Sequence, residues 1–166
     1  SMRDICMHYG GMTRPSQTAN SQISILSGKT KIHWFTGTSL PCLSIFKPFC
    51  FEAGLPDLGD KPSDKYNPKS YWWFAERFHR MFQTCYKDYI SEYAAERDAL
   101  QSKIIKEVDK IIASGDLKGM YSLSKSAFEE ERKLIEKWCA KIRVKRLPFL
   151  YGRKWKKVNK QAGLKI

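Results

Sequence analysis

Residues 5–51 show a two-residue alternation of hydrophobic and polar side chains, which is typical of strands that pack one face on a core. Two alternating runs are separated by a Ser-Gly-Lys-Thr turn at residues 27–30, so the pattern predicts a β hairpin. The hydrophobic side of this pattern comprises Ile23, Ile25, Ile32, Trp34 and Thr36. A third run, residues 43–46, is predicted as a short strand between Pro41 and Pro48, since proline does not donate a ladder hydrogen bond.

The pattern then changes to one typical of a loop followed by helix. Residues 54–70 are rich in Gly, Pro, Asp and Ser, which predicts a surface loop. Residues 71–113 contain no Pro or Gly, and their hydrophobic side chains recur at intervals near 3.6 residues. This predicts one long helix, or two joined by a bend near residues 96–97, with Ser70 as N-cap and Gly115 as stop. The hydrophobic stripe is Phe74, Phe78, Met81, Cys85, Tyr89, Tyr93, Leu100, Ile104, Val108 and Ile111.

A further helix is predicted from about Ser122 or Ser124 to Arg143, because this segment is rich in Glu, Lys, Leu and Ala. Beyond Pro148 no period is recognisable, so residues 148–166 are predicted as an extended, partly ordered tail. The hydrophobic side of the predicted helix comprises Phe128, Leu134, Ile135 and Trp138.

These elements predict an α+β fold, with a small antiparallel sheet covered by a long helical hairpin. The expected organisation is sheet, loop and long helix in residues 1–113, a second helix in residues 114–147, and a basic tail in residues 148–166. No apolar run approaches the roughly 20 residues that a membrane-spanning helix needs. The N-terminus also lacks the basic-then-apolar layout of a secretion signal. We therefore expect a soluble protein with no membrane partner.

The formal net charge of +13 is concentrated at the C-terminal end. From Arg132 onward the chain has thirteen Lys and Arg residues and one acidic residue, Glu136. A charge confined to one end is more typical of a tail or a docking face than of a nucleic-acid-binding fold. The alternative function is still a non-catalytic interaction or nucleic-acid-binding module, in which cations neutralise phosphates and an aromatic ring stacks on a base. Its residues would be Arg153, Lys154, Trp155, Lys156 and Lys157.

The five cysteines are odd in number and widely spaced, with no Cys-x-x-Cys pair and no histidine at a metal-ligand interval. They are predicted to be free thiols, which favours a reducing compartment such as the cytoplasm. Neither a metal nor another cofactor is expected. The cysteines are Cys6, Cys42, Cys50, Cys85 and Cys139.

Several segments together carry a family resemblance: CMHYGG (6–11), RPSQT (14–18), HWFTGTSLPCLSIFKP (33–48), and YWW (71–73) leading into ERFHR (76–80). In this order they are similar to the C-terminal portion of secernins and of the bacterial cysteine dipeptidases related to them. The resemblance runs from about Ile5 to Val108, and its most specific part is the TGTS-to-FKP stretch. Pro15 departs from the commonest family spelling, which changes the local loop because proline fixes φ and removes a donor.

The resemblance implies part of an N-terminal-nucleophile hydrolase, an αββα sandwich in which an N-terminal cysteine attacks an amide carbonyl and its own α-amine serves as base. In the family this cysteine lies upstream of the CMH segment, so it is expected to be missing here. The chain is thus expected to be the C-terminal fragment of a dipeptidase-like cysteine hydrolase acting on small peptides. The implied partners are the missing N-terminal half and a small peptide, with a homo-oligomer as a further option and nucleic acid less favoured.

Cys6 and His8 are the candidates for a nucleophile and base within this chain, but no orienting acid accompanies them. A buried cysteine and a hydrogen-bonded histidine are the simpler interpretation. A substrate-binding role suits the polar, glycine-bearing loop that follows, where backbone amides and a guanidinium would hold a peptide carboxylate. An ordinary turn is the alternative. The candidate substrate-binding residues are His8, Gly10, Gly11, Arg14, Gln17 and Thr18.

The aromatic run at residues 71–74 is interpreted as core rather than as a ligand platform, because the same helix continues with hydrophobic residues at helical spacing. Residues 36–39 are expected to form a bulge or a sharp turn, in which Gly37 lets the backbone approach a neighbour. Four polar residues on the other side of the helix are expected to face solvent or an interface: Glu76, Arg77, His79 and Arg80.

Overall fold

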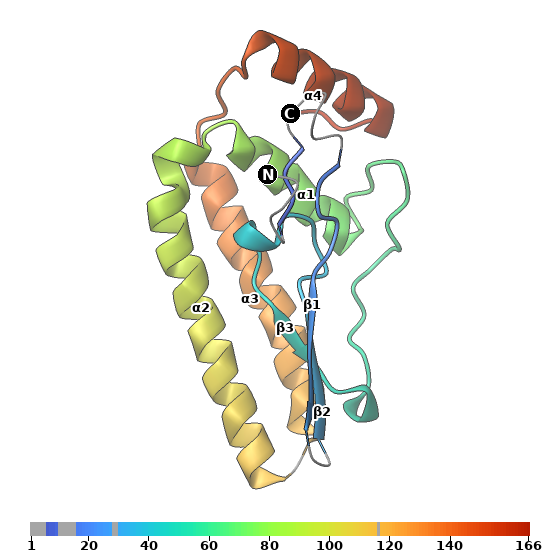
Figure 1. Ribbon diagram of the computed structural model, residues 1–166. Coiled ribbons are helices and arrows are strands. Elements are labelled where there is room, and N and C mark those ends of the chain that lie inside the picture. The colour runs from blue at the N-terminus through green and yellow to red at the C-terminus, as the bar shows by residue number, and fades with distance from the viewer. Residues whose placement is uncertain (1–5, 10–15, 28–29, 116) are drawn as a thin grey trace.

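The computed structural model describes residues 6–9, 16–27, 30–115 and 117–166. The described part of the chain forms an α+β fold, as predicted, in which a three-stranded antiparallel sheet packs beside four α-helices (Figure 1). The elements are β1 (Gln22–Ser27), β2 (Thr30–Phe35), β3 (Lys47–Phe49), α1 (Tyr71–Gln83), α2 (Tyr86–Ser114), α3 (Gly119–Lys141) and α4 (Phe149–Ala162), with short 3-10 turns η1 (Pro41–Leu43) and η2 (Phe51–Ala53).

The predicted hairpin is confirmed. Strand β1 pairs antiparallel with β2, and the register places Ile23 opposite Trp34 and Ile25 opposite Ile32. Directly opposite residues share one face of a sheet, so these four side chains point to the same side. On that side Ile32 and Trp34 pack into a cluster with hydrophobic residues of α2 and α3: Ile104, Val108, Met120 and Ala127.

The third strand lies later than predicted. Residues 41–43 form η1 instead, and the strand comprises Lys47–Phe49. Pro48 therefore lies inside the strand, paired with Trp34, rather than ending it. The strand order β1-β2-β3 puts β3 at an edge of the sheet, where a proline without an N–H is tolerated.

The long helical segment divides at residues 84–85 and not near residues 96–97. Ser70 is the N-cap residue of α1, and Gly115 ends α2 with φ 72°, both as predicted. The hydroxyl of Thr84 donates to the carbonyl oxygen of Met81 at 2.8 Å. This kind of local side-chain bond competes with the helical backbone pattern, and neither a Gly nor a Pro marks the break in the sequence.

The prediction of an extended tail is wrong, because residues 149–162 form α4. The helix lies across the end of the molecule beside α1 (Figure 1). Its hydrophobic side includes Trp155 and Ala162, which are 7% and 6% exposed. The side-chain amide oxygen of Asn159 accepts a 2.7 Å hydrogen bond from Arg80 of α1. The many lysines and arginines of this segment concealed the helical period of the few apolar residues.

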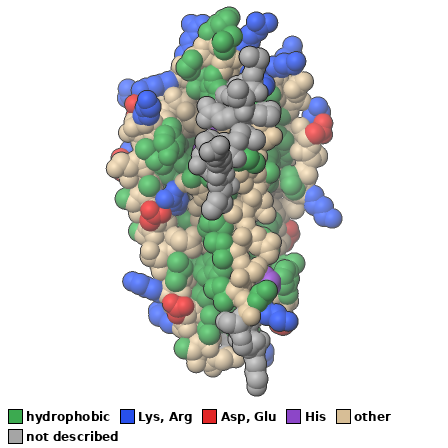
Figure 2. Space-filling model, in the orientation of Figure 1, with side chains coloured by type: hydrophobic (Ala, Val, Ile, Leu, Met, Phe, Trp, Pro, Cys, Tyr) green, Lys and Arg blue, Asp and Glu red, His purple; other side chains and the backbone are tan. Residues whose placement is uncertain are grey.

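Strand β1 is the less covered edge of the sheet. Ile23 and Ile25 are 53% and 48% exposed although their partners Trp34 and Ile32 are buried. Figure 2 shows hydrophobic side chains gathered in a strip on the lower part of the molecule, in the region between α2 and β1. The apolar side of the sheet thus extends beyond the cover that α2 and α3 provide.

None of the helices within the described ranges has both the length and the apolar character to cross a membrane.

Candidate functional site

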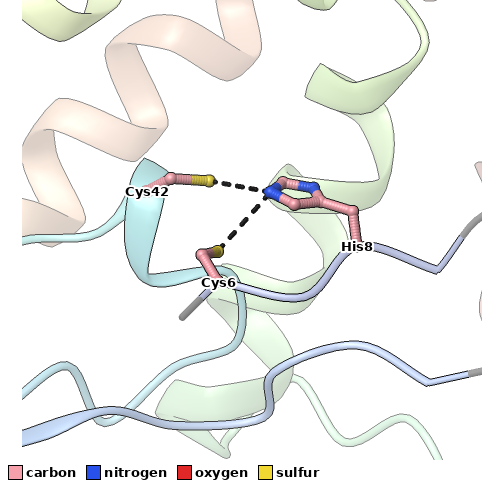
Figure 3. A group of neighbouring side chains, drawn as sticks. All are labelled: Cys6, His8 and Cys42. Atoms are coloured by element: carbon pink, nitrogen blue, oxygen red, sulfur yellow. Dashed lines mark hydrogen bonds between the residues drawn. The ribbon is translucent and has the colours of Figure 1, made fainter. Parts of the chain in front are cut away.

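Two cysteines and a histidine from distant parts of the chain meet at one point. His8 Nε2 is 3.5 Å from Cys6 Sγ and 3.3 Å from Cys42 Sγ. Figure 3 shows both sulfur atoms turned toward the same ring nitrogen. All three residues are half-buried. Cys6 and His8 are candidates from the sequence, whereas Cys42 has no predicted role beyond that of a free thiol.

Hydrogen bonds hold the backbone around this cluster. The amide of Met7 donates to the Thr18 hydroxyl at 2.8 Å, and the amide of Thr18 donates to the Met7 carbonyl at 2.9 Å. The amide of Leu40 then donates to the Thr18 carbonyl at 3.0 Å. Leu40 is fully buried and has φ 48°, a strained conformation for a residue with a side chain. Leu40 is the N-cap residue of η1, where Cys42 lies.

The two thiols of the cluster differ in acidity. A hydrogen bond with the Cys42 side chain is the largest effect on Cys6 and, with help from His8, lowers the pKa of Cys6 to about 4 against the opposing effect of burial. The same hydrogen bond, together with burial, raises the pKa of Cys42. The contact between the two sulfur atoms thus favours a state in which one of the two thiols is ionised. A thiolate is the nucleophilic and metal-binding form of cysteine.

A buried carboxylate, Glu76, connects three of the segments that carry the family resemblance. It accepts hydrogen bonds from the Gln17 side-chain amide at 3.1 and 3.3 Å, and from the hydroxyl of Ser39. Arg80, one turn further along α1, forms an ion pair with it at 2.6 Å. Glu76 itself is 0% exposed. The prediction that Glu76 faces solvent or an interface is therefore wrong, because Glu76 is buried inside the fold as the hydrogen-bond partner of two loops that pack on α1.

His79 is also fully buried, again contrary to prediction. Its Nδ1 lies 3.0 Å from the Ser39 hydroxyl, and its Nε2 has no partner within the described ranges. Burial, followed by the positive charge of Lys47, lowers the pKa of His79 to about 3. The imidazole is therefore neutral. Ser39, His79 and Glu76 do not form a catalytic triad, because the carboxylate contacts the serine rather than the imidazole.

A second buried charge lies on β3. Lys47 is 0% exposed and forms an ion pair with Glu131 of α3. Glu131 also accepts hydrogen bonds from the Ile45 amide, at 2.7 Å, and from the Tyr71 hydroxyl. Burial lowers the pKa of Lys47, and the attraction of Glu131 opposes that shift. The ion pair between Lys47 and Glu131 fastens β3 to α3. Tyr71 is buried in the core, as predicted for the aromatic run at residues 71–74.

The predicted turn at residues 36–39 is present. Gly37 has φ 61°, and a Cβ atom there would lie 3.2 Å from the ring of Phe128. The residue thus needs both the left-handed backbone conformation and the space of a glycine. Ser39, two residues further on, can then reach Glu76.

The candidate substrate-binding residues divide into three groups. Gly10, Gly11 and Arg14 lie outside the described residues. The side chains of Gln17 and Thr18 bind Glu76 and the Met7 amide respectively, so both serve the fold of the loop. His8 lines a cavity of about 710 Å³ between the N-terminal segment, α2 and the connection to α4. Tyr86, Asp88 and Tyr151 are among the other residues of that cavity.

The basic C-terminal end forms one wall of a larger cavity of about 940 Å³. No acidic residue belongs to the described lining, which contains seven cationic side chains: Arg80, Lys145, Arg146, Arg153, Lys156, Lys160 and Lys165. Trp155, the residue expected to stack on a base, is instead buried, with its ring 5.3 Å from that of Tyr9 and 5.0 Å from the Arg80 guanidinium. It is therefore not available to a nucleic acid in this structure. Lys154 and Lys157 are exposed on the same helix.

Comparison with protein-family models, with curated proteins and with solved structures gives no match. The family resemblance thus depends on the residues of the chain themselves.

Proposed function

We propose that this chain is the C-terminal part of a dipeptidase-like cysteine hydrolase, which cleaves amide bonds of small peptides. The nucleophilic cysteine, with its α-amine as base, is carried on another segment. The complete domain is an αββα sandwich of the N-terminal-nucleophile type. The chain described here contributes one sheet, the helices that cover it, and side chains that line or support the substrate site.

The observation that carries this proposal is the meeting of separate segments at Glu76. Gln17 belongs to the RPSQT segment, Ser39 to the TGTS segment, and Arg80 to the ERFHR segment. These are the segments on which the family resemblance rests, and all three make polar contacts with the one buried carboxylate. Their meeting is what we expect if the three segments resemble the family as one arrangement and not as unrelated short strings.

The uncovered side of β1 supports the proposal independently. Edge strands with exposed apolar faces are normally covered or blunted in complete domains. Here Ile23 and Ile25 remain about half exposed on the side where the core lies. The missing N-terminal half of the domain is the partner that would cover them.

The state of the cysteines bears on the cellular compartment of the protein. All five cysteines are described, and all are free thiols. Free thiols persist in a reducing compartment, so we place the protein in the cytoplasm.

The direct test of the missing nucleophile is an assay of the isolated chain with a panel of dipeptides. We expect no turnover, because the reacting thiol and α-amine are not on this chain. Cys6→Ala and Cys139→Ser are the matched variants, since both remove a half-buried thiol and only the first belongs to the site. Turnover that disappears in Cys6→Ala and persists in Cys139→Ser would contradict the proposal and make Cys6 the nucleophile.

The cationic cavity favours a second candidate, a non-catalytic module that binds a polyanion through α4. Because each neutralised phosphate releases counterions, binding of a labelled oligonucleotide would then weaken steeply with added salt. Arg153→Gln with Lys156→Gln would remove two charges from the cavity, and Lys106→Gln with Lys125→Gln is the control with the same charge change elsewhere. Sub-micromolar, sequence-selective binding that only the first pair abolishes would favour this module over the hydrolase. Weak binding without sequence preference would favour the hydrolase.

A further inference from the structure

The hydrolase chemistry proposed above does not use the cluster of Cys6, His8 and Cys42. The two Sγ atoms and the Nε2 atom all lie within 4.8 Å of one another. The two sulfur-to-nitrogen distances are 3.5 and 3.3 Å. In a tetrahedral zinc site, bonds of about 2.3 Å to sulfur and about 2.0 Å to nitrogen put such ligand atoms about 3.5 Å apart. The two sulfur-to-nitrogen distances thus already match those of a single bound ion.

The chemistry of the three groups selects the kind of ion. Thiolates and imidazole suit Zn²⁺, whereas Mg²⁺ and Ca²⁺ prefer oxygen ligands, of which the cluster has none. The three residues are half-buried rather than enclosed. Three protein ligands with an open side are typical of a zinc site that keeps a fourth position for water or another ligand.

A disulfide bond or a nucleophile-and-base pair would use only two of the three side chains. A disulfide between Cys6 and Cys42 would give the imidazole no function, although its Nε2 lies close to both sulfur atoms. A nucleophile-and-base pair would need His8 and only one of the two thiols. A metal ion would use all three groups.

The backbone on both sides of the cluster is fixed before any ligand arrives. Residues 6–8 are held through the two hydrogen bonds between Met7 and Thr18. On the other side, the guanidinium of Arg97 donates to the carbonyl oxygen of Cys42. Supporting contacts of this kind orient the residues that bind a metal. The site is therefore preorganised, although its ligands come from positions far apart in the sequence.

We propose that Cys6 Sγ, His8 Nε2 and Cys42 Sγ bind one Zn²⁺ ion, with a fourth position open to solvent. Both sulfurs bind as thiolates, and any thiol proton passes to solvent. The imidazole binds as the neutral ring with its remaining proton on Nδ1. The ion would fasten the segment at residues 6–8 to η1. This inference stands independently of the hydrolase proposal.

Titration of the reduced chain with Co²⁺ tests the site, because cobalt replaces zinc and is visible. We expect one equivalent to produce a thiolate-to-cobalt charge-transfer band together with the visible bands of a tetrahedral ion, and one equivalent of Zn²⁺ to remove both. Cys42→Ser and His8→Ala should each weaken binding by at least about 100-fold, since even residues that only support metal ligands contribute about 10-fold to 100-fold. Cys139→Ser, a half-buried thiol in the hydrophobic core, should bind as the parent does.

Far-UV circular dichroism of each variant shows that a loss of binding is not a loss of fold. A charge-transfer band that persists unchanged in folded Cys42→Ser would overturn the proposal, and so would the absence of the band in the reduced parent chain. Mass spectrometry of the chain purified without reductant adds a separate test. A Cys6–Cys42 disulfide that forms in air and is not prevented by prior loading with Zn²⁺ would also overturn it.

Discussion

The side-chain amide of Gln17 donates hydrogen bonds to both carboxylate oxygens of Glu76, 59 positions further along the chain. The contact fastens a loop near the N-terminus to the first helix. The same carboxylate accepts a hydrogen bond from Ser39 and forms an ion pair with Arg80. The buried carboxylate of Glu76 thus fastens the loops that carry Gln17 and Ser39 to α1.

We expect Glu76→Gln to lower the free energy of unfolding by about 3 kcal/mol, because it leaves the nearly buried charge of Arg80 without its partner. Urea unfolding followed by circular dichroism measures the change. Glu129→Gln, an exposed position on α3, is the control and should change stability by no more than about 0.5 kcal/mol. Equal stability of the two variants would mean that Glu76 does not organise the site.

The pH dependence of stability should report the burial of His79. Its pKa in the fold is about 3, against an ordinary value of 6.5, so below pH 6.5 the unfolded chain binds a proton that the folded chain does not. Stability therefore falls as the pH decreases toward 3. The loss from this one group should reach about 2 kcal/mol near pH 5.

Urea unfolding between about pH 7 and pH 5 checks this dependence. His79→Gln should make the slope shallower than that of the parent by the contribution of His79, and Cys6, whose pKa is also lowered in the fold, should account for part of the slope that remains. His33→Gln, on the hairpin and partly exposed, is the control and should leave the slope of the parent. An equally steep slope in His79→Gln would contradict the account of His79 as a neutral buried imidazole.

The hairpin shows which parts of this fold can be predicted from sequence. The alternation of Ile23, Ile25, Ile32 and Trp34 is local information, and it gives the right strands and the right sides. The caps at Ser70 and Gly115 are local as well. The break at residues 84–85 has no local signal of this kind, because no glycine or proline marks it. There the hydroxyl of Thr84 donates to the carbonyl oxygen of Met81.

The candidate site is less predictable for the same reason. Glu76 and His79 have the pattern of a solvated helix face, and only the arrival of the loops with Gln17 and Ser39 buries them. Cys42 lies 34 positions from His8, too far for any spacing rule to connect them. Contacts of this kind depend on the tertiary fold.

Helix α4 should contribute to stability and should not behave as a dispensable tail. Trp155→Ala removes a ring that packs on Tyr9 and Arg80, and we expect a loss of about 3 kcal/mol in the free energy of unfolding. Phe149→Ala is the control on the same helix, because Phe149 is 72% exposed. A Trp155→Ala variant as stable as Phe149→Ala would mean that α4 does not pack on α1 in solution.

The uncovered side of β1 should make the isolated chain self-associate. Sedimentation velocity over a range of concentrations should show dimers or larger species, because apolar strand surface without a partner favours association. Ile23→Ser with Ile25→Ser should shift the chain toward monomer. Ile105→Ser, at 43% exposure on α2, is the control and should not. A parent chain that stays monomeric at high concentration would indicate that the domain is complete.

The most direct test of the central claim is to supply the N-terminal half that the proposal assigns to another segment. The chain is mixed with the N-terminal portion of a bacterial cysteine dipeptidase that begins at its nucleophilic cysteine, and hydrolysis of a dipeptide panel is measured. We expect turnover in the mixture and in neither part alone, reduced when Ile23→Ser and Ile25→Ser disturb the shared edge, and abolished when the cysteine of the added portion is changed to alanine. A mixture with no turnover, in which sedimentation shows that the two parts do not associate, would contradict the assignment of this chain to a dipeptidase-like hydrolase.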